Sequence, residues 1–321
     1  MSELVLAIDI GGTSMKGALV DRQGHLSSRF VVPVVPGEEQ ESALDRLIAS
    51  AKDALKSVEE GNRVIAIGCG VPGGINTFTG VCDYASNLGW KNLPVARILS
   101  DKLSLACKID NDANAAMLGE IKFGQDKTYQ NAILLTLGTG IGGGIYVNGQ
   151  LYAGNEGKGA EIGHMVIVAG GIPCPCGRKG CFEAYASATA LTRETKKAVE
   201  AHPESLMAEE VHSGAKIDAA LPFECAKRGD AVAQAVIDQY IEYLGIGCLN
   251  LVDIFRPEVI ILSGGVSKQG ENLRLPLVRY LEKMEYGFGI DKAPKVDVKI
   301  SRLGADIGIY GAAALGFSIG E

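Results

Sequence analysis

Two segments far apart in the chain share one pattern: an apolar run, a glycine-rich turn and a second apolar run. The first is Leu6–Thr13 (LAIDIGGT) followed by Gly17–Val20, and the second is Leu134–Ile145 (LLTLGTGIGGGI). Short apolar runs bounded by glycine are typical of buried strands, and glycine turns with exposed N–H groups can bind phosphate. Each turn alone is equally compatible with an ordinary tight hairpin. The matched pair predicts a duplicated unit and favours a nucleotide bound between two domains.

Strand-like and helix-like segments alternate along the rest of the chain, which predicts an α/β fold. Residues 42–58 have apolar side chains at helical spacing, whereas residues 64–70 and 132–137 are β-rich runs that end at glycine or a turn. A further helix is expected over residues 113–120. At 321 residues the chain is longer than a single hydrophobic core usually supports, so we expect two domains.

Composition excludes several functional classes. The net charge of −7 argues against nucleic acid or an anionic membrane as the main partner. The N-terminus has no basic region before its apolar run, so a signal peptide is not expected, and no apolar run is long enough to span a bilayer. Five cysteines are scattered and odd in number, which favours buried thiols in a reducing cytoplasm over disulfides; they are Cys69, Cys82, Cys107, Cys225 and Cys248.

A cluster of potential metal ligands lies in the second half of the chain, where His164, Cys174, Cys176 and Cys181 fall within one short stretch. One histidine and three cysteines predict a tetrahedral zinc site with no open position, which is typical of a structural metal. The alternative is three buried core thiols and a hydrogen-bonded histidine, but the sequence CPCGRKGC is rich in turns and polar residues. A redox pair is disfavoured because no C-x-x-C is present here.

The second glycine turn formally satisfies the dinucleotide fingerprint G-x-G-x-x-G over Gly138–Gly143. That fingerprint requires a helix to begin at the glycines, whereas this chain continues as a strand and a turn through Gly149. We therefore exclude a dinucleotide-binding fold, and the phosphate-binding lysine loop of NTPases is also absent. Lys16 is available as a charge partner for a phosphate at the first turn.

Asp112 follows a predicted strand and opens a predicted helix, in the sequence IDNDANAA. Aspartate is among the preferred helix N-caps, so one interpretation is purely structural. The other is a general base at the strand end. A helix N-terminus makes a carboxylate a weaker base, but phosphoryl transfer tolerates this because the base accepts its proton late. The residues alone leave both roles open.

The order of IDIGGTSMK, IDNDANAAMLGE, LTLGTGIGGGI, EIGH and CPCGRKGCFEAYAS resembles the ROK family of sugar kinases, most closely its bacterial glucokinases. The resemblance covers essentially the whole chain, and the zinc motif C-x-C-G-x-x-G-C-x-E is met at every position from Cys174 to Glu183. It implies an actin-like, ribonuclease-H-like α/β fold of two domains around a cleft. The implied domains are residues 1–113 with 304–321, which carry the first phosphate loop, and residues 114–303, which carry the second loop, the zinc site and the nucleoside pocket.

The resemblance also implies ATP-dependent phosphorylation of a hexose, with glucose converted to glucose 6-phosphate and Asp112 as the general base. His164 would bind zinc through one ring nitrogen and sugar through the other, and Asp9 would hold Mg²⁺ through water. The implied sugar ligands are Gly74, Asn87, Asn111, Asp112, Glu161, His164 and Glu183. The implied contacts with ATP are Gly11, Gly12, Thr13, Lys16, Gly138 and Thr139 at the phosphates, and Gly264 and Gly265 at the nucleoside. Homodimers or homotetramers are common in the family.

Two departures from the family pattern concern the sites. Ser14 stands where many relatives have lysine, so ATP affinity is expected to rest more on magnesium. Ala188 replaces a usual glycine, and its methyl group either crowds the sugar pocket or stiffens the loop.

Kinases of N-acetylmannosamine, N-acetylglucosamine or fructose are the alternatives within the family. A sugar-sensing repressor is disfavoured because the first phosphate loop lies so near Met1 that no DNA-binding domain is expected before it, and an actin-like ATPase without a sugar substrate would not explain the EIGH and CPCG motifs.

Overall fold

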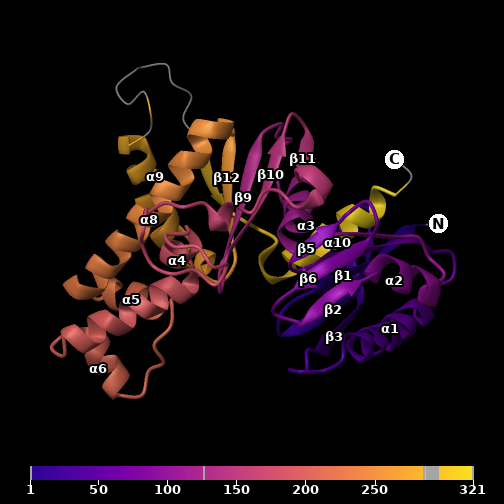
Figure 1. Ribbon diagram of the computed structural model, residues 1–321, viewed down its shortest axis with the longest axis horizontal. Coiled ribbons are helices and arrows are strands. Elements are labelled where there is room, and N and C mark those ends of the chain that lie inside the picture. Colours follow the sequence, from indigo (N-terminus) through magenta and orange to yellow (C-terminus); the bar gives the residue numbers. More distant parts are fainter. Residues whose placement is uncertain (1, 126, 285, 287–295, 320–321) are drawn as a thin grey trace. The chain divides into compact units, whose positions relative to one another are not determined.

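Two five-stranded mixed sheets with the same strand order dominate the fold (Figure 1). In the first sheet, β3-β2-β1-β4-β8, strand β2 is antiparallel to β1 and β3, and β4 is parallel to β1 and β8. In the second, β11-β10-β9-β12-β13, strand β10 is antiparallel to β11, and β12 is parallel to β9 and β13. The shared order supports the duplication that the two glycine turns indicate.

The computed structural model describes residues 2–125, 127–284, 286 and 296–319, and the chain divides into two units. The first unit comprises Met1–Thr128, Gly144–Ala160 and Arg302–Glu321, and the second comprises Tyr129–Gly143 and Glu161–Ser301. Residues 114–128 and 144–160 thus group with the first unit, whereas the sequence-based division assigned them to the larger domain. That division remains a prediction, and its last two residues, 320–321, lie outside the described part.

The first unit is built on a sheet whose central strand is apolar on both faces. Leu6 and Ile8 of β1 belong to one buried cluster, and Val5 and Ala7 belong to another. Such burial on both faces is typical of strands covered by helices on each side. The elements of this unit are β1 (Glu3–Ile10), β2 (Ser14–Asp21), β3 (Leu26–Pro33), α1 (Gln40–Lys56), β4 (Arg63–Val71), β5 (Gly74–Asn76), β6 (Val81–Ala85), β7 (Trp90–Leu93), α2 (Val95–Leu103), β8 (Cys107–Asn111), α3 (Asp112–Gly119), a π-helical turn (Glu120–Gly124), β11 (Gln150–Tyr152) and α10 (Ile307–Phe317).

Helix α10 packs directly onto the first sheet, and this contact explains its small residues. A methyl group added at Gly68 of β4 would overlap the carbonyl oxygen of Ala312, and one added at Gly316 would overlap Val5 of β1. The close approach therefore depends on glycine at both positions. It also fixes the first turn of α10 at the end of β1 that carries Asp9.

Among the described residues, the second unit combines β9, β12, β13 and the start of β10 with six helices. Its longest helix, α8, begins after Asp230, whose Oδ1 accepts hydrogen bonds from the N–H groups of Val232 (2.9 Å) and Ala233 (3.2 Å). Asp230 is therefore an N-cap of the expected type. The elements are β9 (Ala132–Leu137), β10 (Ile141–Val147, which ends in the first unit), α4 (Glu183–Ala186), α5 (Ala188–Ala201), α6 (Leu206–His212), α7 (Leu221–Lys227), α8 (Ala231–Phe255), β12 (Val259–Ser263), α9 (Glu271–Met284) and β13 (Asp297–Ile300). Among the described residues, no helix has the length and apolar character that crossing a membrane requires.

Candidate functional site

Asp9 lies near the end of β1, opposite Lys16 of β2 in the antiparallel ladder. Burial raises the pKa of Asp9, and the charge of Lys16 partly offsets this by lowering it. A methyl group added at Gly308, in the first turn of α10, would overlap the Asp9 carboxyl group. The Asp9 carboxyl group therefore lies in space that is open only because residue 308 is glycine. This space is beside the first glycine turn.

The first glycine turn is closed by a hydrogen bond from the N–H of Gly11 to the carbonyl oxygen of Ser14 (3.0 Å). A methyl group added at Gly12 would lie 3.6 Å from Cβ of Asn87. The first unit thus brings together Gly12, which the family resemblance implies as a phosphate contact, and Asn87, which it implies as a sugar contact.

The turn between β8 and α3 is held by Asn111, which is the N-cap of the helix. Its Oδ1 accepts hydrogen bonds from the N–H groups of Ala113 (2.9 Å) and Asn114 (3.3 Å), and its Nδ2 donates to the carbonyl oxygen of Gly73 (3.1 Å). The interpretation of Asp112 as the N-cap is therefore wrong by one residue. Asp112 is the first residue of α3, and its Oδ1 accepts from the N–H of Ala113 (2.9 Å).

The carboxyl end of β4 links these groups. A methyl group added at Gly70 would lie 3.7 Å from Cα of Asp112 and 4.0 Å from Oδ1 of Asp9. The ring of Tyr84 packs against Gly74, just beyond β4. Any side chain at Gly74 would overlap that ring. Asp9 and Asp112 therefore lie together at one end of the first sheet, and Gly74 follows Gly73, which accepts the hydrogen bond from Asn111.

Asp110 stabilises this turn through two hydrogen bonds, although it is not among the site residues predicted from the sequence. Its side chain is only 6% exposed, and its Oδ1 accepts hydrogen bonds from Nδ2 of Asn114 (2.9 Å) and the N–H of Asn111 (2.7 Å). Burial raises the pKa of Asp110, although these hydrogen bonds act in the opposite direction. An acidic residue directly after the apolar Ile109 of a short strand, four positions before an asparagine, was the signal available in the sequence.

The second glycine turn follows β9 in the second unit. The N–H of Gly138 donates to the carbonyl oxygen of Gly140 (3.1 Å), and the N–H of Gly142 donates to Oγ1 of Thr136 (3.1 Å). The N–H of Ala188 donates to the carbonyl oxygen of Gly138 (2.8 Å), so the turn is tied to the start of α5. Thr139 lies within this turn.

The potential metal ligands His164, Cys174, Cys176 and Cys181 gather in one place, with their donor atoms all within 4.8 Å of one another. Nδ1 of His164 lies 3.7 Å from Sγ of Cys174, and Sγ of Cys176 lies 3.6 Å from Sγ of Cys181. Zinc–ligand bonds of 2.0–2.3 Å place the donors of a tetrahedron about 3.3–3.8 Å apart. The donor set and both of these distances therefore fit a zinc ion.

The backbone around the cysteines forms a tight knuckle. The N–H of Cys174 donates to the carbonyl oxygen of Arg178 (2.8 Å), and the N–H of Gly177 donates to that of Cys174 (3.0 Å). The backbone N–H of Arg178 lowers the pKa of Cys176 to about 6, whereas burial raises that of Cys174. A thiolate at Cys176 is what a metal ligand requires.

Two glutamates lie close to this cluster in the sequence. One of them, Glu183, also contacts it. Oε1 of Glu183 lies 3.3 Å from Nδ1 of His164 and 3.0 Å from Sγ of Cys174. The side chains of His164 and Glu183 are 29% and 18% exposed, so both remain accessible to a ligand. Glu161 directly precedes the short helical turn Ile162–His164. Burial raises the pKa of Glu161, while the charge of His164 lowers it.

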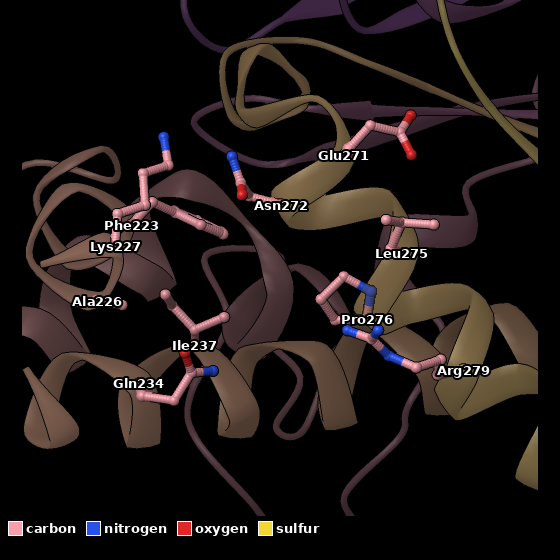
Figure 2. A pocket seen from close by; sticks show the side chains of 10 residues that line it. All are labelled: Phe223, Ala226, Lys227, Gln234, Ile237, Glu271, Asn272, Leu275, Pro276 and Arg279. Carbon is pink, nitrogen blue, oxygen red and sulfur yellow. The ribbon is translucent and has the colours of Figure 1, made fainter. Parts of the chain in front are cut away.

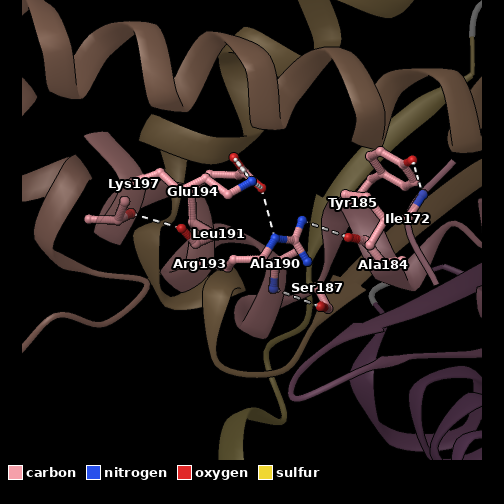
Figure 3. Close-up of polar contacts among 10 residues, drawn as sticks. Ile172, Ala184, Tyr185, Ser187, Ala190, Leu191, Arg193, Glu194 and Lys197 are labelled. Carbon is pink, nitrogen blue, oxygen red and sulfur yellow. Dashed lines mark hydrogen bonds and ion pairs between the residues drawn. The ribbon is translucent and has the colours of Figure 1, made fainter. Parts of the chain in front are cut away.

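The short helix α4, which begins at Glu183, is fixed by contacts along its length (Figure 3). The carbonyl oxygen of Ala184 accepts from Nη2 of Arg193 (2.9 Å), and Oη of Tyr185 accepts from the N–H of Ile172 (2.7 Å). At its end, the carbonyl oxygen of Ala186 accepts from Oη of Tyr240 (2.9 Å). These contacts hold the backbone that carries Glu183.

Gly264 and Gly265 follow β12. Gly264 has φ +86°, and a methyl group there would lie 2.6 Å from the carbonyl oxygen of Leu137, so glycine is required at this position. A cavity of about 300 Å³ lies between α7, α8 and α9 of the same unit (Figure 2). Its lining includes Phe223, Lys227 and Asn272 but neither glycine. No local sequence pattern indicates this cavity, because its residues belong to three separate helices.

Comparisons with known proteins agree in placing the chain among sugar-related proteins. The model of the ROK family matches residues 5–318. A glucokinase of Halalkalibacterium halodurans is 36% identical over 313 residues, which cover 97% of this chain and 94% of that protein. A xylose repressor of Caldicellulosiruptor bescii is 33% identical over 271 residues, which cover 83% of this chain and 67% of the repressor.

A solved structure gives the same result at the level of the fold. The crystal structure of a ROK family glucokinase from Streptomyces griseus, in complex with glucose and AMPPNP, has a TM-score of 0.82 and 33% sequence identity. The match covers 98% of this chain and 99% of that chain. The likeness therefore extends through both units of the chain.

Proposed function

Because this chain belongs to the ROK family, we propose that it transfers the γ-phosphoryl group of ATP to the 6-hydroxyl group of glucose. It is an ATP-dependent hexose kinase, as its curated glucokinase relatives and the glucokinase structure support at near full length. Glucose as the preferred hexose is our proposal. The segment after Cys181, Glu183-Ala-Tyr-Ala-Ser187, supports glucose because it resembles the corresponding segment of glucokinases.

The observation that carries the proposal is that each unit places a glycine turn beside a polar group suited to sugar. Gly12 adjoins Asn87 in the first unit, and Gly140 adjoins Glu183 in the second. A phosphoryl-transfer enzyme needs its acceptor next to the phosphates, since its catalysis consists mainly of positioning and charge stabilisation. The actin-like, ribonuclease-H-like fold is proposed with it, supported by the shared order of the two sheets.

We assign the nucleotide contacts as follows. The turn residues Gly11, Gly12 and Thr13, with Lys16, bind phosphate, and Gly138 and Thr139 do so from the second unit. Gly264 and Gly265 line the nucleoside site. Mg²⁺, when bound, neutralises charge that develops on the phosphates. Asp9 fits it as a partner through water, because its carboxyl group lies beside the first turn.

Asp112 acts as the general base in this proposal. Its Oδ1 accepts the N–H of Ala113, which fixes the carboxylate at the start of α3, and a carboxylate oxygen takes the proton of the sugar hydroxyl as the new bond to phosphorus forms. Asn111 positions this turn through its cap and its bond to Gly73. The remaining hydroxyl groups are bound by side chains or backbone of Gly74, Asn87, Asn111, Glu161, His164 and Glu183.

We also propose that His164, Cys174, Cys176 and Cys181 hold a structural Zn²⁺. A bound zinc ion fixes the cysteine knuckle and supplies no open coordination position for chemistry. With Nδ1 of His164 directed at Cys174, Nε2 remains for sugar. The knuckle therefore orients the imidazole ring and the neighbouring Glu183.

The direct test is product formation. Purified chain incubated with glucose and Mg-ATP should yield glucose 6-phosphate, detected by ³¹P NMR, and release one ADP for each sugar phosphate. ATP hydrolysis without a sugar phosphate would contradict the proposal. Binding of sugar without turnover would instead favour a sensor, as in the repressor relative. A cytoplasmic location and a homodimer or homotetramer remain predictions.

A further inference from the structure

Gly140 and Glu183 meet at one point in the second unit. A methyl group added at Gly140 would overlap Oε2 of Glu183. The other oxygen of the same carboxylate, Oε1, lies 3.0 Å from Sγ of Cys174 and 3.3 Å from Nδ1 of His164. One carboxylate therefore faces the cysteine knuckle on one side and the second glycine turn on the other.

The backbone is held by hydrogen bonds on both sides of this contact. The backbone of α4, which carries Glu183, accepts hydrogen bonds at Ala184 from Arg193 and at Ala186 from Tyr240. The side-chain hydroxyl of Tyr185 accepts a further bond from the N–H of Ile172, and Figure 3 shows the contacts of Ala184 and Tyr185. The turn is held by the bond from the N–H of Ala188 to the carbonyl oxygen of Gly138 (2.8 Å). A side chain at residue 140 would therefore displace the carboxylate rather than the backbone around it.

We propose that Gly140 is a positioning residue for the sugar: the space left by its missing side chain is where the Glu183 carboxylate must lie in order to bind a sugar hydroxyl. This inference rests on the proposed function. It assigns to the glycine turn a second role besides phosphate binding, namely to form the wall that sets the position of Glu183. Gly140 contributes to sugar affinity without itself touching the sugar.

The experiment measures glucose binding by isothermal titration calorimetry in the wild type and in Gly140→Ala, Glu183→Ala and the double variant. We expect Gly140→Ala to raise the dissociation constant of glucose at least about tenfold. It should change that of Mg-AMPPNP by less than about threefold and leave the zinc content unchanged. In the Glu183→Ala background, Gly140→Ala should cost nothing further, because the clashing carboxylate is gone.

Three results would overturn the inference: wild-type glucose affinity in Gly140→Ala, additive losses in the double variant, or loss of zinc from Gly140→Ala. If Gly140→Ala does not fold, the double variant decides, because Glu183→Ala should restore folding by removing the clash, and failure to do so would overturn the inference too. Failure of the proposed function is recognised separately. In that case the wild type would form no glucose 6-phosphate from glucose and Mg-ATP, whatever its affinity for glucose.

Discussion

Replacement of Asp112 by asparagine separates its structural role from its catalytic one. Oδ1 of Asp112 accepts the N–H of Ala113 at 2.9 Å, and the amide oxygen of asparagine can accept the same bond. Asn111, not Asp112, caps α3, so the helix keeps its start. The substitution therefore removes the proton-accepting carboxylate and keeps both this hydrogen bond and the helix cap. We expect unchanged folding and a dissociation constant for glucose within a few-fold of the wild type.

The expected loss is in kcat. A positioned general base is worth about 10²–10⁴ in rate, or about 2.7–5.4 kcal/mol of transition-state stabilisation. The lower part of that range is expected, because the transition state of phosphoryl transfer is loose and the base takes its proton late. A loss in kcat with KM nearly constant is the signature of an interaction made only in the transition state.

The assay couples ADP release to NADH oxidation over a range of glucose concentrations and pH values. The acidic limb of the wild-type pH–rate profile should disappear in Asp112→Asn. Asp53→Asn, on the exposed side of α1 where it pairs with Lys56, removes an equal charge and should leave kcat unchanged. A kcat within tenfold of the wild type in Asp112→Asn, with the acidic limb intact, would refute the assignment of the base.

Two further substitutions test the metal and the buried acid. Cys176→Ser should abolish stoichiometric zinc, measured by mass spectrometry of the metal, and weaken glucose binding by about 10- to 100-fold; intact glucose affinity would contradict the bracing role. Burial raises the pKa of Asp110 above its ordinary 3.8, so between the two values the native state binds more protons than the unfolded chain. The free energy of unfolding contributed by Asp110 therefore falls as pH rises through that window. Asp110→Asn should flatten this slope in urea titrations, and an unchanged slope would show that another group causes it.

The sequence predicted the elements whose signals are local. The β-rich run at residues 132–137 forms β9 with the same bounds, and the helical spacing in residues 42–58 corresponds to α1, Gln40–Lys56. Both signals arise from the period of apolar residues, which the backbone geometry imposes. The cysteine and histidine cluster also gathers as expected, since its spacing in the chain is short and rich in turns.

What the sequence could not predict depends on contacts between distant segments. The overlap of Gly140 with Glu183 is one example, because nothing local distinguishes this glycine from its neighbours in the turn. The cap of α3 is another. Asparagine and aspartate are both good N-caps, so residue type does not show which of the two caps the helix. In the structure Asn111 is the cap, and its side chain also donates a hydrogen bond to Gly73, which lies just after β4.

The specificity constants of this chain show whether it phosphorylates glucose in preference to other hexoses. We would measure kcat/KM with saturating Mg-ATP for glucose, mannose, fructose, N-acetylglucosamine and N-acetylmannosamine. We expect the highest kcat/KM for glucose, with the acetamido sugars at least about tenfold lower. A higher kcat/KM for an acetamido sugar or for fructose would contradict the glucose assignment, and no turnover of any of the five would contradict the proposed hexose kinase activity itself.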